Sequence, residues 1–245
     1  MRKSKLTLRY PVFAEFERMH QALVDAGGKL LEDEKRCFLS LFRAVEVALG
    51  YETHTHPWQR EHCTFLVNFM HQHFIRQNMT AEAIRLLHRN IIPPQTKGVF
   101  VYGEAQKDEE IARGRYRHID TYLKDADGDE VDFLPHTQIA DALEEAVAAF
   151  HHSPKKIADI ARFFLAYNAI HPFMDGNGKV GRLLLEALLV AHGYYPALLK
   201  KSYAKEKKRV VELKCRYIQE PHHQDEVVEA FVRFLLYGCY KVVYF

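Results

Sequence analysis

The sequence lacks the features of an exported or membrane-embedded chain. No stretch approaches the roughly 18 consecutive apolar residues of a membrane-spanning helix. The basic start MRKSKLTLRYPVF is not followed by the apolar run of a signal peptide. The 245 residues include only four cysteines, with no CxxC pair and no zinc-like spacing. We therefore expect a cytoplasmic protein with reduced thiols and no membrane partner, while secretion as an effector without a cleaved signal stays open.

The chain also lacks a large charge of one sign and has no low-complexity segment. With 34 basic and 32 acidic residues, its formal net charge of +2 gives the whole molecule no strong attraction to nucleic acid. Hydrophobic residues make up 48% and charged residues 27%, which is typical of a globular protein. No nucleic-acid partner is expected, and any argument from charge has to be local.

Apolar residues recur at intervals of three and four along most of the chain, which predicts helices. The helical stretches are residues 12–92, 137–152, 154–170, 179–192 and 200–245. Between Pro93 and Pro135 the pattern changes to the β-prone runs GVFVYGE and YRHIDTYLKDADGDEVDFL, the second of which contains the turn-rich KDADGDE. We therefore expect an all-α, mainly helical fold with an embedded β-hairpin.

One short stretch, AIHPFMDGNGKVGRLL at residues 169–184, places many polar groups between two apolar runs. Pro172 is expected to end the incoming helix, and Phe173 is expected to be buried. Gly176 and Gly178 indicate backbone conformations that other residues avoid, just before a helix. The free N–H groups and partial positive charge of a helix start form an anion-binding nest, so this loop predicts a phosphate site.

The charged residues of this stretch fit phosphate chemistry. Lys179 and Arg182 lie three apart, so both cations can face the same way. Asp175 beside a phosphate would most simply hold Mg²⁺, and His171 has the pKa range of a general base for a hydroxyl group. The alternative is a purely structural turn, in which Asp175 caps the helix and both cations are solvated.

The stretch HPFMDGNGKVGR resembles the signature of the Fic (Fido) family, H-x-F-x-[DE]-G-N-G-[RK]-x-x-R, and departs from its usual form only at Lys179, where arginine is commoner. The segments AIRLLHRNII and GRYRHIDTYL precede it in the order of the family. The resemblance covers about residues 80–200. It implies a Fic core domain at 80–200, an N-terminal helical extension at 1–79, and C-terminal helices at 201–245 that pack on the core.

The resemblance implies a protein adenylyltransferase that transfers AMP from ATP to a Ser, Thr or Tyr hydroxyl of a target protein, with Mg²⁺. The catalytic residues it implies are His171 as general base, Asn177 at the α-phosphate, and Arg182 at the distal phosphates. The nucleotide-binding residues it implies are Gly176, Gly178, Lys179 and Arg182, and the implied metal ligand is Asp175. Lys179 lacks the bidentate fork of arginine, which leaves the identity of the donor open.

Several alternatives remain open at this stage. Gly178, where the kinase-like Doc branch of the family has lysine, favours nucleotidyl transfer. Transfer of UMP or phosphocholine, removal of AMP, and a catalytically silent binding module stay open. The resemblance also implies that the hairpin at 115–134 is a flap that holds the target protein by strand addition. No clean copy of the family's inhibitory motif, [ST]-x-x-x-E-[GN], is present. Inhibition by a separate partner, inhibition by an N-terminal segment and the absence of inhibition therefore all remain open. A homo-oligomer also remains open.

Overall fold

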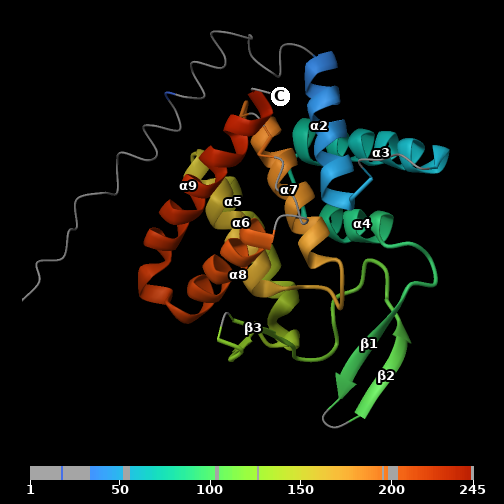
Figure 1. The fold of residues 1–245 in the computed structure, drawn as a ribbon, viewed down its shortest axis with the longest axis vertical. Helices are drawn as coiled ribbons and strands as arrows, with labels where there is room; N and C mark the ends of the chain where they lie inside the picture. The colour runs from blue at the N-terminus through green and yellow to red at the C-terminus, as the bar shows by residue number, and fades with distance from the viewer. Residues whose placement is uncertain are drawn as a thin grey trace, which may run out of the picture.

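The protein is described here from a computed structural model that covers residues 18, 34–51, 56–102, 105–125, 127–194, 196–197 and 204–243. Helices dominate these ranges (Figure 1). They are α2 (Glu34–Leu49), α3 (Pro57–Met70), α4 (Ala81–Ile91), α5 (Ile139–His152), α6 (Ile157–Ile170), α7 (Asn177–Ala191), α8 (Ala204–Gln219) and α9 (Gln224–Val243). Short helical turns are η2 (His71–Arg76), η3 (His136–Gln138) and η4 (Pro221–His223). Apart from residue 18, the helix expected near residues 12–27 lies outside the described residues.

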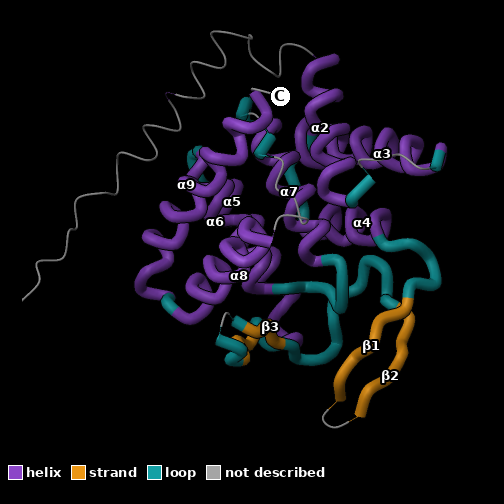
Figure 2. The backbone as a smooth tube through the Cα atoms, viewed as in Figure 1, coloured by secondary structure: helices purple, strands orange, loops and turns teal. Residues whose placement is uncertain are grey.

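The predicted helical fold with an embedded hairpin is confirmed, but the described part of the chain contains two hairpins where one was expected. Strand β1 (Lys97–Tyr102) pairs antiparallel with β2 (Ala105–Glu110), and β3 (Tyr122–Lys124) pairs antiparallel with β4 (Glu130–Asp132). The β1–β2 hairpin extends away from the helices, whereas β3 lies at the edge of the helical body (Figure 2). The sequence of β2, AQKDEE, has no β-branched or aromatic residue, which is why local propensity did not predict it.

Helices α6 and α7 form the centre of the molecule. Helix α7 contacts α2, α4 and α6, and α6 also contacts α5, α8 and α9. Buried side chains occur on every side of α7 from Val180 to Val190, as expected for a helix surrounded by others. One continuous core runs from Leu41 in α2 to Leu235 in α9, so the helices on both sides of the central segment pack on the same core.

The helix ends follow from local chemistry. The Thr80 side chain accepts a hydrogen bond from the Ala83 N–H and caps α4, as its position predicts. The C-terminal helical stretch, expected to be continuous, is broken at Pro221, because proline lacks the N–H that a helix interior needs. None of the described helices is both long enough and apolar enough to cross a membrane.

Candidate active site

The polar loop begins where α6 ends, at His171. This residue adopts a left-handed conformation, with φ 49° and ψ 62°, and its N–H donates to the Tyr167 carbonyl. For a residue other than glycine this conformation costs about 1–2 kcal/mol. Pro172 follows and cannot continue the helix. The chain therefore turns sharply at the predicted general base, and the surrounding packing has to hold a strained backbone there.

Arg117 stabilises this turn through hydrogen bonds to main-chain carbonyl groups. Its buried guanidinium donates from Nε to the His171 carbonyl at 2.9 Å and from Nη1 to the Ile119 carbonyl at 2.7 Å, and Nη2 donates to the Leu134 carbonyl. The Arg117 N–H also donates to the Pro172 carbonyl at 2.8 Å. Three hydrogen bonds from one guanidinium thus connect the polar loop with both ends of the β3–β4 segment.

The His171 ring lies against the β3–β4 segment. Phe133 stacks on it with ring centroids 3.9 Å apart and planes 16° apart. Burial lowers the pKa of His171 most, the positive charges of Lys214 and Arg117 also lower it, and a hydrogen bond with the Asn168 main chain acts in the opposite direction; together they place the pKa at about 3. The imidazole is therefore neutral near pH 7, which is the form in which it can accept a proton.

Asn177 shapes the loop through its side chain. Its Oδ1 accepts from the Phe173 N–H at 2.9 Å, and its Nδ2 donates to the Phe173 carbonyl at 2.6 Å. Both side chains are buried, as expected for Phe173. One Nδ2 hydrogen remains for a ligand, because a side-chain amide carries two. Asn177 thus stabilises the loop through two hydrogen bonds with Phe173, a role that the sequence did not predict. The prediction had assigned Asn177 only to the α-phosphate.

His88 on α4 holds the loop from the opposite side, and the sequence did not assign it this role. The Gly114 N–H donates to its Nδ1 at 2.8 Å, so Nε2 carries the proton and donates to the Asp175 carbonyl at 3.0 Å. Its ring stacks on Phe173 at 3.9 Å. Burial lowers the pKa of His88 to about 4, which keeps it in the neutral tautomer that both hydrogen bonds need.

The two glycines of the loop differ. Gly176 has φ 78°, and a Cβ there would lie 2.8 Å from Ile92 Cδ1 and 3.4 Å from the His88 ring, so glycine is required. The same expectation for Gly178 is wrong. Gly178 lies in the first turn of α7, which begins at Asn177, and a Cβ there would only touch Arg182 Nη1 at 3.5 Å. The first turn of α7 lies where the anion nest was predicted, and the nest itself stays a prediction.

Asp175 lies exposed at the start of α7, and its carboxylate makes no hydrogen bond or ion pair with the described residues. The described part of the chain has no group of three His, Cys, Asp or Glu side chains that could hold a metal by itself. Mg²⁺ is usually bound by one or two carboxylates together with phosphate oxygens and water. A single accessible carboxylate beside a phosphate nest therefore fits Mg²⁺ that arrives with a nucleotide.

Arg182 lies partly buried between α7 and the end of α2. One Nη2 hydrogen is donated to the Ala48 carbonyl at 3.0 Å, while Nε is buried without a partner. Burial lowers the pKa of Arg182, and the charge of Glu186 partly offsets this. Lys179, one turn earlier, makes no ion pair with the described residues and is partly exposed. The two predicted phosphate-binding cations thus retain unused donors.

The hairpin predicted at 115–134 has a well-formed tip. Asp125 Oδ1 accepts from the N–H groups of Asp127 and Asp129, both at 2.9 Å, so this carboxylate stabilises the turn. Tyr122 on β3 is 43% exposed. Each strand of a two-stranded sheet also keeps one unpaired edge, which is the feature that strand addition requires.

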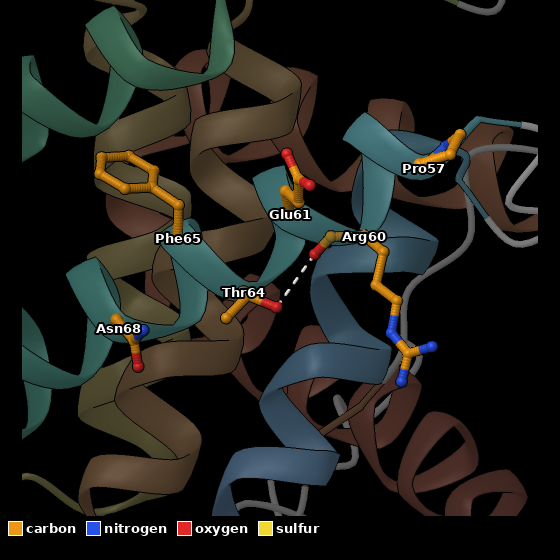
Figure 3. Close-up of a pocket in the computed structure, with 6 residues that line it drawn as sticks. All are labelled: Pro57, Arg60, Glu61, Thr64, Phe65 and Asn68. Carbon is orange, nitrogen blue, oxygen red and sulfur yellow. Dashed lines mark hydrogen bonds between the residues drawn. The ribbon is translucent and has the colours of Figure 1, made fainter.

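A separate hollow lies on the outer face of α3 (Figure 3). Its volume is about 790 Å³, and its lining residues are Pro57, Arg60, Glu61, Thr64, Phe65 and Asn68. All of them belong to α3, and none belongs to the loop that starts at His171. We therefore do not connect this hollow with the candidate active site.

Comparison with known proteins agrees with this geometry. Residues 78–189 match the family model described as Fic/DOC family. A segment of 55 residues is 44% identical to protein adenylyltransferase Fic of Aedes aegypti, covering 22% of this chain and 11% of that protein. The protein of the same name from Drosophila erecta is 40% identical over 57 residues, which cover 23% and 11% of the two chains. The matched segment thus spans about a tenth of the length of these relatives.

Solved structures share the fold over nearly the whole chain. A Fic domain containing signaling protein from Bacteroides thetaiotaomicron aligns with a TM-score of 0.63 and 16% identity, covering 95% of both chains. IbpAFic2, solved covalently tethered to Cdc42, aligns with a TM-score of 0.58 and 16% identity, covering 91% of this chain and 70% of that one. Residues 78–189, which contain the loop from His171 to Arg182, are thus similar to the Fic/DOC family, and the fold is that of the solved Fic structures.

Proposed function

We propose that this protein is an adenylyltransferase that moves AMP from ATP to a Ser, Thr or Tyr hydroxyl of a target protein. The observation that carries the proposal is the arrangement around one loop. Four groups lie together there. The neutral imidazole of His171 stands at the start of the loop, and the accessible carboxylate of Asp175 and the N-terminus of α7 stand at its end. The fourth group is the guanidinium of Arg182, which has an unpaired donor. The names of the relatives from Aedes aegypti and Drosophila erecta support the same activity.

The residues of the loop perform separate parts of the transfer. The free ring nitrogen of His171 takes the proton of the target hydroxyl, and the hydroxyl oxygen forms a bond to the α-phosphorus. The bond from the α-phosphorus to the bridging β-phosphate oxygen breaks, and pyrophosphate leaves with the electron pair. The first amides of α7, the remaining Nδ2 hydrogen of Asn177 and the guanidinium of Arg182 bind the phosphate oxygens.

Asp175 would hold Mg²⁺, which neutralises phosphate charge when bound. The negative phosphates also act on His171, because they offset the repulsion from Lys214 and Arg117. The pKa of the imidazole then rises from about 3, while burial still holds it below its ordinary value. Binding of the nucleotide thereby makes the imidazole of His171 a stronger base.

We propose a protein acceptor held along the 115–134 hairpin and a cytoplasmic location. The unpaired edges of β3–β4 and the hydrogen bonds that Arg117 makes between this segment and the loop support the first proposal. The neighbour that was solved tethered to Cdc42 agrees with a protein acceptor. The free, buried thiols of Cys63 and Cys215 support a reducing compartment, where Mg-ATP is also available.

The test is to incubate the purified chain with a cell lysate, Mg²⁺ and one of three donors: ATP, UTP or CDP-choline. Mass spectrometry of modified peptides is expected to find AMP on hydroxyl side chains with ATP as donor. His171→Ala is expected to abolish the modification, and His222→Ala, which changes an exposed histidine outside the loop, is expected to leave it unchanged. UMP or phosphocholine on the peptides would contradict the choice of donor. No modification with any donor would instead support a silent binding module.

A further inference from the structure

A second cation reaches the active site from outside the family match. Lys214 belongs to α8, which follows the matched residues 78–189 and packs against α6 and β4 (Figure 1). Its Nζ lies 5.9 Å from the centroid of the Phe164 ring on α6, two turns before His171. Lys214 is also close enough to His171 and to Arg182 for its charge to act on both. The C-terminal helices thus place a positive charge beside the catalytic loop.

Among the residues that the structure describes, the ammonium of Lys214 has no anionic partner. It makes no hydrogen bond or ion pair with the described residues, and Phe164 offers it only the face of a ring. Besides burial, the groups that act on it are the positive charge of Arg182 and the thiol of Cys215. Burial and Arg182 lower the pKa of Lys214 to about 8. Lys214 is half-buried, and a partly dehydrated cation that is repelled by Arg182 and has no acceptor destabilises the folded protein, so the position needs a reason.

The neighbouring charges indicate what would relieve this cost. Arg182 donates to a neutral carbonyl and keeps Nε unpaired, although Glu186 offsets part of its charge. Lys214 has no such acid among the groups that act on it. Two cations that repel each other and retain free donors are stabilised together by one polyanion between them. In this site, which already offers the amides of α7, that polyanion is a chain of phosphates.

We propose that Lys214 is a phosphate-binding residue of this active site, which contacts the phosphate chain of the nucleotide together with Arg182. The inference rests on the proposed function for the identity of the nucleotide, but its chemistry requires only a polyphosphate. It also gives the C-terminal helices a role beyond packing, because α8 supplies a part of the site that the sequence signature does not contain. Loss of Lys214 weakens the binding of phosphates and leaves the binding of an uncharged nucleoside unchanged.

The experiment compares the wild type with Lys214→Met, Lys214→Arg and the control Lys208→Met, which removes an exposed lysine from the same helix. Isothermal titration calorimetry at pH 7 measures the Kd of Mg-ATP, of tripolyphosphate and of adenosine. One charge-assisted hydrogen bond corresponds to about a 10- to 100-fold change in Kd. Lys214→Met is expected to weaken the binding of ATP and of tripolyphosphate by this factor and to leave the Kd of adenosine unchanged. Lys214→Arg is expected to retain most of the affinity, and Lys208→Met is expected to bind all three ligands like the wild type.

Two further measurements separate this role from a structural one. Without ligand, Lys214→Met is expected to raise Tm by about 2 °C, because it removes a half-buried charge that Arg182 repels. The NMR titration of the His171 ring is expected to shift to higher pH in Lys214→Met and to stay in place in Lys214→Arg, because only the first variant removes the repulsion.

The inference is overturned if Lys214→Met binds ATP and tripolyphosphate like the wild type. It is also overturned if adenosine binding falls by the same factor, since that result indicates a general disturbance of the site. Failure of the proposed function looks different. A wild type that binds tripolyphosphate through Lys214 but never transfers AMP would contradict the proposed reaction and support the role of Lys214.

Discussion

The two glycines beside Asn177 are expected to respond in opposite ways to replacement by alanine. Gly176→Ala places a side chain on a residue with φ 78°, which costs about 1–2 kcal/mol. Its Cβ would also lie 2.8 Å from Ile92 Cδ1, so the tip of Ile92 has to leave its rotamer in a packed core, at about 0.5–1.5 kcal/mol. We expect Gly176→Ala to lower the free energy of unfolding by about 2–3 kcal/mol.

Gly178→Ala is the matched control. This residue is helical, and its Cβ would make an ordinary contact at 3.5 Å from Arg182 Nη1. Alanine is a better helix residue than glycine, so the free energy of unfolding is expected to rise by up to about 0.5–1 kcal/mol. Urea denaturation followed by circular dichroism measures both variants. The reasoning is refuted if the two variants change stability by the same amount.

A double-mutant cycle isolates the steric part of the Gly176 effect. Ile92→Val removes Cδ1, the atom that the new Cβ would meet. In this background Gly176→Ala should cost about 1 kcal/mol less than in the wild type, because only the strain of the backbone remains. Strict additivity of the two substitutions would place the entire effect on the backbone and contradict the predicted contact.

Two further predictions concern buried rings. The pKa of His88 is about 4 in the folded protein and about 6.5 in the unfolded chain, so the unfolded state binds the proton first as the pH falls. The contribution of His88 to the free energy of unfolding is therefore complete above pH 6.5 and declines by about 3 kcal/mol down to pH 4. Urea titrations at several pH values should show this decline in the wild type and a smaller one in His88→Gln. Phe133→Ala uncovers the His171 ring, so NMR should find its pKa raised from about 3 toward the ordinary value, while Tyr122→Ala on the same hairpin should leave it unchanged. Titration of His171 near pH 6.5 in the wild type would contradict the role given to burial.

The helices and the polar loop were predictable because their signals are local. Apolar spacing identified α2, α4, α6 and α7, and the order of the twelve residues from His171 to Arg182 identified the Fic-like loop that the family model also matches. The burial of Phe173 followed from its being the large apolar residue of the loop. These features depend on neighbours in the chain, which the sequence displays directly.

The parts that were not predicted depend on contacts between distant residues. His88 bonds to Asp175, which lies 87 residues away, and in the sequence it looks like any histidine in an apolar helix. Arg117 acts on a carbonyl 54 residues away, and Lys214 reaches the site only because α8 packs against α6. Strand β2 forms because β1 lies opposite, since its own residues favour no sheet. In each case the tertiary fold supplies the partner.

The central claim is that the loop transfers the α-phosphate of ATP with its nucleoside and releases pyrophosphate. It is tested most directly by parallel reactions with ATP that carries radioactive phosphorus at the α or the γ position, using the wild type and His171→Ala. The account predicts that protein acquires the α label and not the γ label, and that His171→Ala acquires neither. Labelling from the γ position would indicate a kinase reaction, and equal α labelling by His171→Ala would remove the general base on which the mechanism depends.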